Sequence, residues 1–235
     1  MKKAQILSLL SAGLMTLTTI AQQAGADPVV DSYLTQRGIT KALPGTNYTG
    51  SAYLDDNFQR GGIYKNGQLV ESQMVLRYNA LRDEIEVKDD LNTPDSQARI
   101  LRKNKSFYVK IQNDLYVFET NPGYENAKPG YFKVLLESSP VSLYQKQRKE
   151  YIEGKKSINS ISADILPSFK DSDILYLVDR NGQYTELAAS KNGKLKAFGK
   201  DRKELKRYAK EADLHINRNR DLVKLIEHYN SLKTK

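Results

Sequence analysis

Short runs of alternating apolar and polar residues follow one another along most of the chain. In residues 107–111, Phe107, Val109 and Ile111 occupy every second position. A period of two is typical of a strand with one buried face. The expected strands are residues 62–65, 68–72, 73–78, 84–88, 98–103, 107–111, 115–119, 131–136, 141–147, 174–178 and 184–188.

Turn-forming residues separate these runs at short intervals. Asn66-Gly67 predicts a type I′ hairpin, because both central residues of that turn need a positive φ. Further turns are expected at residues 79–83, at Asn181-Gly182 and at Asn192-Gly193. Residues 151–173 are mostly polar, and we interpret them as an insertion that interrupts the series of strands.

The hydrophobic period changes near residue 201. Asp201 is placed to cap a helix, with Glu204 as the reciprocal partner of a capping box. A second helix is expected from Asn219 or Arg220 onward, and the short joint at residues 215–218 favours an antiparallel pair. The apolar stripes are Leu205, Tyr208, Ala209 and Ala212 in the first helix, and Leu222, Leu225, Ile226, Tyr229 and Leu232 in the second.

This order of elements predicts an α+β fold. We expect a predominantly antiparallel β meander, forming a curled sheet or roll, with two C-terminal α-helices. An outer-membrane barrel is the competing architecture, but it requires strands of about ten residues and no basic helical end. The expected segments are a signal peptide at residues 1–26, a β-rich domain at 27–190 and a basic helical hairpin at 191–235 packed on it.

The first 26 residues have the pattern of an export signal. Lys2 and Lys3 precede an apolar stretch at residues 6–20, and Ala24-Gly25-Ala26 supplies small residues before an expected cleavage at Asp27. The alternative is an N-terminal membrane anchor, for which the stretch is short. We therefore expect an exported protein, periplasmic or secreted, with no transmembrane span in the mature chain. The chain has no cysteine, so disulfides do not stabilise the fold.

Positive charge is concentrated at the C-terminal end. From Lys191 onward there are 14 Lys and Arg residues against 6 Asp and Glu residues, whereas residues 4–190 hold 21 against 22. The basic residues Lys203, Lys206, Arg207 and Lys210 are the candidate binding residues. In an exported protein, an anionic envelope component or an acidic protein is the expected partner, and nucleic acid is not. A face that is merely solvated is the alternative.

The segment RYNALRDEIEV at residues 77–87 resembles a group of uncharacterised exported proteins of Gram-negative bacteria. Further matching motifs are FKVL at 132–135, LY at 143–144 and HYN at 228–230. The resemblance implies export and a shared fold over most of the mature chain. No established activity is associated with the group, so no catalytic residue is carried over.

The acidic residues Asp83, Glu84 and Glu86 are the candidate catalytic groups. Glu84 and Glu86 share one strand face, and paired carboxylates can hydrolyse glycosidic bonds. Neighbouring acids on one strand more commonly form a solvated face, with Arg77 and Arg82 as partners here. With two histidines and no cysteine we expect no metal site, and no motif indicates a cofactor.

We therefore expect a non-enzymatic envelope binding or interaction module of unknown ligand. One alternative is a hydrolase that acts on an envelope polymer through carboxylates. The other is a periplasmic carrier or chaperone that holds an acyl chain or an unfolded client inside the curl.

Overall fold

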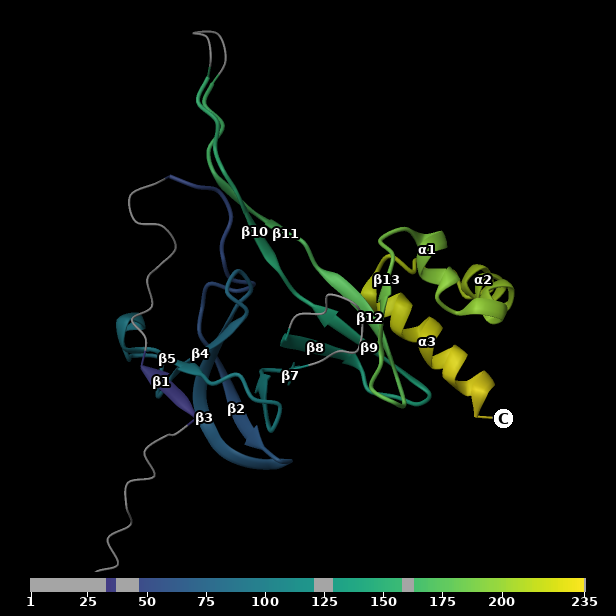
Figure 1. Ribbon diagram of the computed structural model, residues 1–235, viewed down its shortest axis with the longest axis horizontal. Coiled ribbons are helices and arrows are strands. Elements are labelled where there is room, and N and C mark those ends of the chain that lie inside the picture. Colours follow the sequence, from purple (N-terminus) through teal and green to yellow (C-terminus); the bar gives the residue numbers. More distant parts are fainter. Residues whose placement is uncertain (1–32, 37–46, 121–128, 158–162, 235) are drawn as a thin grey trace, which may run out of the picture. The chain divides into compact units, whose positions relative to one another are not determined.

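The computed structural model describes residues 33–36, 47–120, 129–157 and 163–234 (Figure 1). The chain divides into two units, Met1–Ser32 and Tyr33–Lys235, and the described residues belong to the second. The predicted signal peptide at residues 1–26 lies outside the described residues.

An 11-stranded antiparallel sheet forms most of the structure, as the alternating pattern predicts. Its strand order is β1-β5-β4-β3-β2-β6-β7-β8-β9-β12-β13, and it is an open meander. The strands are β1 Leu34–Gln36, β2 Gln59–Lys65, β3 Gln68–Asn79, β4 Glu84–Lys88, β5 Arg99–Leu101, β6 Phe107–Ile111, β7 Asp114–Glu119, β8 Gly130–Leu136, β9 Val141–Lys146, β12 Ile174–Asp179 and β13 Tyr184–Leu187. A short 3-10 helix, η1 (Asp95–Gln97), precedes β5.

The predicted hairpin at Asn66-Gly67 is confirmed. Asn66 and Gly67 have φ angles of 49° and 84°, and they connect β2 to β3. The prediction of two strands at residues 68–78 is wrong, because β3 is one strand of 12 residues. Its first half is largely exposed and its second half is buried, so the pattern changes within the strand.

The first eight strands enclose a core of apolar side chains. Ile63, Leu76, Ile85, Val87 and Val109 are completely buried in this cluster. Each such side chain contributes about 1.5–3 kcal/mol when it leaves water. The core continues to β8, where Tyr131 packs on the rings of Tyr78 and Phe118.

The polar insertion at residues 151–173, together with the two residues before it, includes two strands that the sequence pattern did not predict. β10 (Lys149–Ile152) and β11 (Ser168–Asp171) form a separate antiparallel ribbon. Thr49 forms a parallel bridge to Ser168 of the ribbon. Tyr151 and Phe169 pack together there with Tyr48.

Three helices follow the sheet, one more than expected. α1 (Lys191–Lys196) occupies the position of the predicted turn at Asn192-Gly193, and the Ser190 hydroxyl caps it by accepting a hydrogen bond from Gly193 N. α2 spans Arg202–Glu211, and α3 spans Asn219–Lys233, close to the predicted start. A 3-10 turn, η2 (Gly199–Asp201), joins α1 to α2.

The predicted capping box before α2 is absent. The side chain of Asp201 makes no cap hydrogen bond, and its carboxylate instead pairs with Lys233 of α3 at 2.7 Å. α3 lies against β8 and β9 (Figure 1). The helices and this part of the sheet share a second core, which contains Leu143, Leu205 and Leu225.

Candidate functional site

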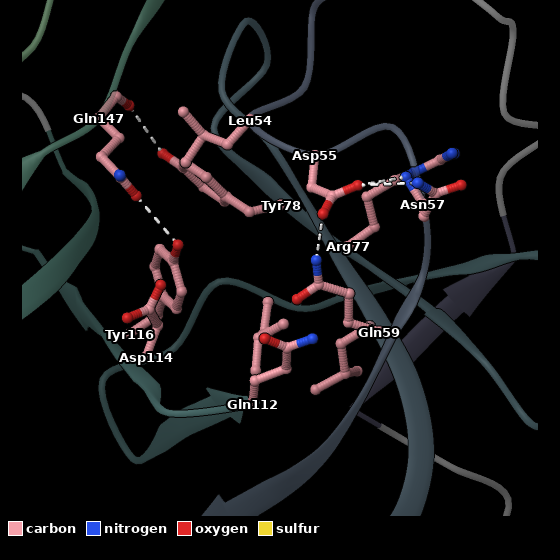
Figure 2. Close-up of a pocket in the computed structure, with 12 residues that line it drawn as sticks. Leu54, Asp55, Asn57, Gln59, Arg77, Tyr78, Gln112, Asp114, Tyr116 and Gln147 are labelled. Carbon is pink, nitrogen blue, oxygen red and sulfur yellow. Dashed lines mark hydrogen bonds between the residues drawn. The ribbon is translucent and has the colours of Figure 1, made fainter.

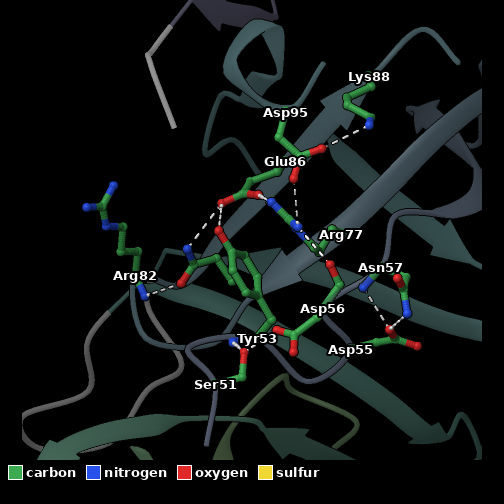
Figure 3. A network of polar contacts seen from close by, with 11 residues as sticks. Ser51, Tyr53, Asp55, Asp56, Asn57, Arg77, Arg82, Glu86, Lys88 and Asp95 are labelled. Atoms are coloured by element: carbon green, nitrogen blue, oxygen red, sulfur yellow. Dashed lines mark hydrogen bonds and ion pairs between the residues drawn. The ribbon is translucent and has the colours of Figure 1, made fainter. Parts of the chain in front are cut away.

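The candidate acid Glu86 belongs to a buried ion pair in the hairpin of β3 and β4 (Figure 3). Arg77 lies opposite Glu86 in the strand register, and its Nη2 and Nε donate to Glu86 Oε2 at 2.7 and 3.0 Å. The predicted role of Arg77 as a partner is confirmed. The predicted solvated face is wrong, because Arg77 is 5% exposed and Glu86 is 1% exposed.

The loop at residues 50–58 and the η1 turn bury this pair. The Tyr53 hydroxyl donates to Glu86 Oε1, and Arg77 Nη1 donates to the carbonyl oxygen of Asp56 at 2.7 Å. The Arg77 guanidinium lies 4.0 Å from the ring centroid of Tyr53 and 4.1 Å from that of Phe58. A cation between two aromatic faces is stabilised by both rings. The charged face of the β3–β4 hairpin, which carries Arg77 and Glu86, is therefore buried under the loop at residues 50–58.

Both oxygens of Glu86 have hydrogen-bond donors. Oε2 accepts from Arg77, and Oε1 accepts from Tyr53 and from Asn79 Nδ2 at 3.1 Å each. Burial, and then the charge of Glu86, raise the pKa of Tyr53 to about 12. Tyr53 is therefore a neutral donor near pH 7, and the carboxylate of Glu86 acts as a structural acceptor.

Asp83 connects the tip of the same hairpin to β8 and β9. Its carboxylate pairs with Lys146 Nζ at 2.7 Å and accepts from the Tyr78 hydroxyl at 2.7 Å. The backbone N–H of Tyr131 donates to it at 3.1 Å. Burial lowers the pKa of Lys146, while the charge of Asp83 opposes this shift. Asp83 thus holds together strands that are distant in the sequence.

The three candidate acids do not form an open catalytic pair. Glu84 lies on the same buried strand face as Glu86, and it is 9% exposed. Asp83 and Glu86 are each committed to an ion pair with a different cation. A glycosidase needs two carboxyl groups on either side of an accessible bond. The surroundings of these acids therefore favour a structural role.

The four candidate binding residues lie together on α2. Lys203, Lys206, Arg207 and Lys210 are all exposed. Arg207 pairs with Glu211 at 3.7 Å, one turn further along the helix. The opposite side of α2 carries Leu205 and Ala209, which are buried in the core shared with α3. The helix therefore has one apolar side and one basic side.

The exposed side of the segment 196–210 extends this charge. Lys196 of α1 and Lys200 of η2 are also exposed, and we call these two residues and the four of α2 the basic surface. Lys194 does not belong to it, because its side chain is buried and donates to the carbonyl of Ile216 at 3.4 Å and to Asn217 at 3.3 Å. Burial lowers the pKa of Lys194.

A small polar pocket lies beside the buried network, and sequence reasoning did not find it (Figure 2). It has a volume of about 250 Å³ and lies between residues 54–59, the end of β3, the β6–β7 turn and Gln147. Its lining comes from four segments that are distant in the sequence. No periodic pattern within one segment could have indicated it.

Among the described residues, no group of three or more His, Cys, Asp or Glu side chains could hold a metal ion. The helices of the described part of the chain are all too short or too polar to cross a membrane. Comparison with known proteins gives no family model, no curated protein and no solved structure that matches this chain.

Proposed function

We propose that the protein is an exported, non-enzymatic binding module whose basic surface contacts an anionic component of the cell envelope. The single observation that carries this proposal is the one-sided charge of the segment 196–210. Its six exposed cations face solvent, while its apolar residues belong to the core. Clustered exposed cations attract anionic surfaces through long-range electrostatics.

The charges of the basic surface are largely uncompensated by their neighbours. Among the described residues, Arg207 is the one member of the surface with an ion-pair partner, and that pair is exposed and 3.7 Å long. An exposed pair of this kind contributes about 0–1 kcal/mol, so it does not neutralise the surface. Lys203, Lys206 and Lys210 are therefore available for an external anion.

The hydrolase alternative finds less support, because Asp83 and Glu86 are saturated by structural partners. The carrier alternative requires space inside the curl. In the described part of the chain, large apolar side chains from β1 to β8 fill the core, and Leu76, Ile85 and Leu101 are completely buried in it. Neither alternative has an observation of its own in its favour.

Sedimentation with lipid vesicles tests the proposal. Vesicles that contain phosphatidylglycerol should bind the protein at about 10 mM salt and release it at about 1 M, where the Debye length falls from about 30 to 3 Å. Each basic residue near an anionic surface contributes about 1 kcal/mol. Replacing Lys203, Lys206, Arg207 and Lys210 together by Gln should therefore weaken binding about 1000-fold.

A matched variant separates the basic surface from net charge. Lys110, Lys155, Lys156 and Lys170 are exposed and lie outside the segment 196–210, so their replacement by Gln removes the same charge. This control should retain most of the binding. Equal losses in both variants, or no sedimentation with anionic vesicles at low salt, would contradict the proposal.

A further inference from the structure

The polar pocket has hydrogen-bonding groups that the fold does not use. Gln112 follows β6 at a positive φ of 52°, and its side-chain amide has no partner among the described residues. Gln147 Oε1 accepts from the Tyr116 hydroxyl at 3.0 Å, and the backbone carbonyl oxygen of Gln147 accepts from the Tyr78 hydroxyl at 3.1 Å (Figure 2). The Nε2 group of Gln147 remains available as a donor within the described structure.

A carboxylate on the other side of the pocket is held in a fixed orientation. The backbone N–H of Asn57 donates to Asp55 Oδ1 at 2.8 Å, and the Asn57 amide donates to the same oxygen at 3.2 Å. Gln59 Nε2 donates to Asp55 Oδ2, and no partner for Gln59 Oε1 occurs in the described ranges. A carboxylate oxygen can accept more than one hydrogen bond. Asp55 Oδ2 accepts one, from Gln59, so it can still receive a hydroxyl donor.

The charge of the lining disfavours an anionic ligand. Arg77 reaches the pocket, but its donors are used by Glu86, Asp95 and the carbonyl of Asp56. Asp114, on the opposite side from Asp55, has an ion pair with Lys133 at 2.6 Å. An anion would therefore meet the unneutralised charge of Asp55 and find no free cation among the described residues that line the pocket.

The lining also has an apolar part. Leu54 is 38% exposed and lines the pocket, whereas the other apolar residues of the lining, Leu76, Ile111, Tyr78 and Tyr116, are at most 7% exposed. Tyr116 remains a hydroxyl donor at neutral pH, because burial and then Asp114 raise its pKa well above its ordinary value. A ligand with hydroxyl groups at its edge and a C–H face would find hydrogen-bonding groups and the exposed apolar side chain of Leu54 in the pocket.

We infer that this pocket binds a neutral sugar residue. Amide and carboxylate groups hydrogen-bond the sugar hydroxyls, and Leu54 contacts the ring. The volume of about 250 Å³ limits the ligand to one ring. This binding is separate from that of the basic surface, so the protein would contact a glycan-bearing partner at two independent places.

Three related monosaccharides test the inference: D-glucose, which is neutral, D-glucuronate, which is anionic, and D-glucosamine, which is cationic. Glucose should shift the backbone amide signals of Gln112 and Asp114 in nuclear magnetic resonance spectra, with a millimolar Kd. Glucuronate should bind at least about fivefold more weakly, because its charge faces Asp55. Preferred binding of glucuronate, or binding of glucosamine alone, would overturn the inference.

Variants relate the shifts to the pocket. Gln112→Ala should raise the Kd for glucose about fivefold, which is the effect of one hydrogen bond. Gln183→Ala removes the same amide from the exposed turn between β12 and β13, and it should leave the Kd unchanged. Asp55→Asn should lower the Kd for glucuronate toward that for glucose, whereas loss of structure would weaken the binding of both sugars.

The absence of any shift at about 100 mM glucose would overturn the inference, because that concentration far exceeds a millimolar Kd. The quadruple Gln variant of the basic surface should bind glucose like the unchanged protein. An experiment that refutes sugar binding by the pocket is therefore distinguishable from one that refutes anion binding by the basic surface.

Discussion

Replacing Arg77 by Met tests whether water is excluded from the buried network of the β3–β4 hairpin. The substitution leaves the Glu86 carboxylate, 1% exposed, with hydrogen bonds from Tyr53 and Asn79 and without its cation. Removing one partner of a buried ion pair costs about 3–5 kcal/mol. The loss of the cation between the rings of Tyr53 and Phe58 adds about 0.5–2 kcal/mol. We expect Arg77→Met to reduce the free energy of unfolding by about 3.5–7 kcal/mol.

Urea unfolding followed by circular dichroism measures this change. With a slope of about 2 kcal/mol per molar urea, the midpoint should fall by about 2–3.5 M. Replacing Arg77 and Glu86 together by Met removes both charges of the pair, so neither is left buried alone, and it should recover about half of the loss. Recovery stays incomplete, because Tyr53 and Asn79 lose their acceptor.

Arg148→Met provides a matched control, since Arg148 pairs with Glu150 at 3.5 Å on the surface. This variant should lose less than about 1 kcal/mol. The reasoning is refuted if Arg77→Met costs no more than Arg148→Met, or if the double variant is no more stable than Arg77→Met alone. Either result would mean that solvent reaches the Glu86 carboxylate.

Three further expectations concern the contacts around Asp83. Gly130→Ala should cost about 1–3 kcal/mol in thermal denaturation, because the added Cβ would overlap Lys146 Nζ and Asp83 Oδ2; an unchanged Tm would show that the ion pair can move aside. The Tyr131 hydroxyl is buried and has no partner among the described residues, so Tyr131→Phe should be neutral or stabilising by about 1 kcal/mol, and a clear loss of stability would show that the hydroxyl is satisfied. Burial raises the pKa of Tyr78 and Tyr131 above the unfolded value of about 10. The unfolded chain therefore releases these protons first. Stability should fall as pH rises past about 10, by about 1.4 kcal/mol per pH unit for each tyrosine. Urea midpoints measured from about pH 9 to 12 should show a shallower decline for Tyr131→Phe, and equal slopes would contradict this account.

Most strands could be predicted, because their signals are local. Asn66-Gly67 marks a hairpin by its own conformational preference, and the burial pattern of β6 follows its alternating residues. The first half of β3 was predicted as a separate strand at residues 68–72, because its burial pattern differs from that of the second half. β10 and β11 were missed because they lack a row of buried apolar residues: within the ribbon, Phe169 is the buried apolar residue.

The surroundings of the candidate site could be predicted only in part. The pattern identified Arg77 as a partner for the acids, since the residues lie on neighbouring strands of one hairpin. The sequence pattern could not show that Tyr53 and Phe58 cover the pair of Arg77 and Glu86, because the residues of the hairpin do not indicate which distant loop packs on them. The exposed side of α2 was predicted correctly, because the helical period itself separates Lys206 from Leu205.

The position of β2 in the sheet has a consequence for how the chain folds. β2 pairs with β3 on one side and with β6 on the other, so it joins the meander of β2–β5 to the strands that begin at β6. Pairing within each group needs only short loops, whereas Gly61 meets Ile111 after all of the first meander has been traversed. Closing a long loop costs more chain entropy than forming a hairpin, and non-local pairing slows folding. We therefore expect each group to form early and the β2–β6 seam to close late, with the ion pair of Asp83 and Lys146 sealing the two groups together.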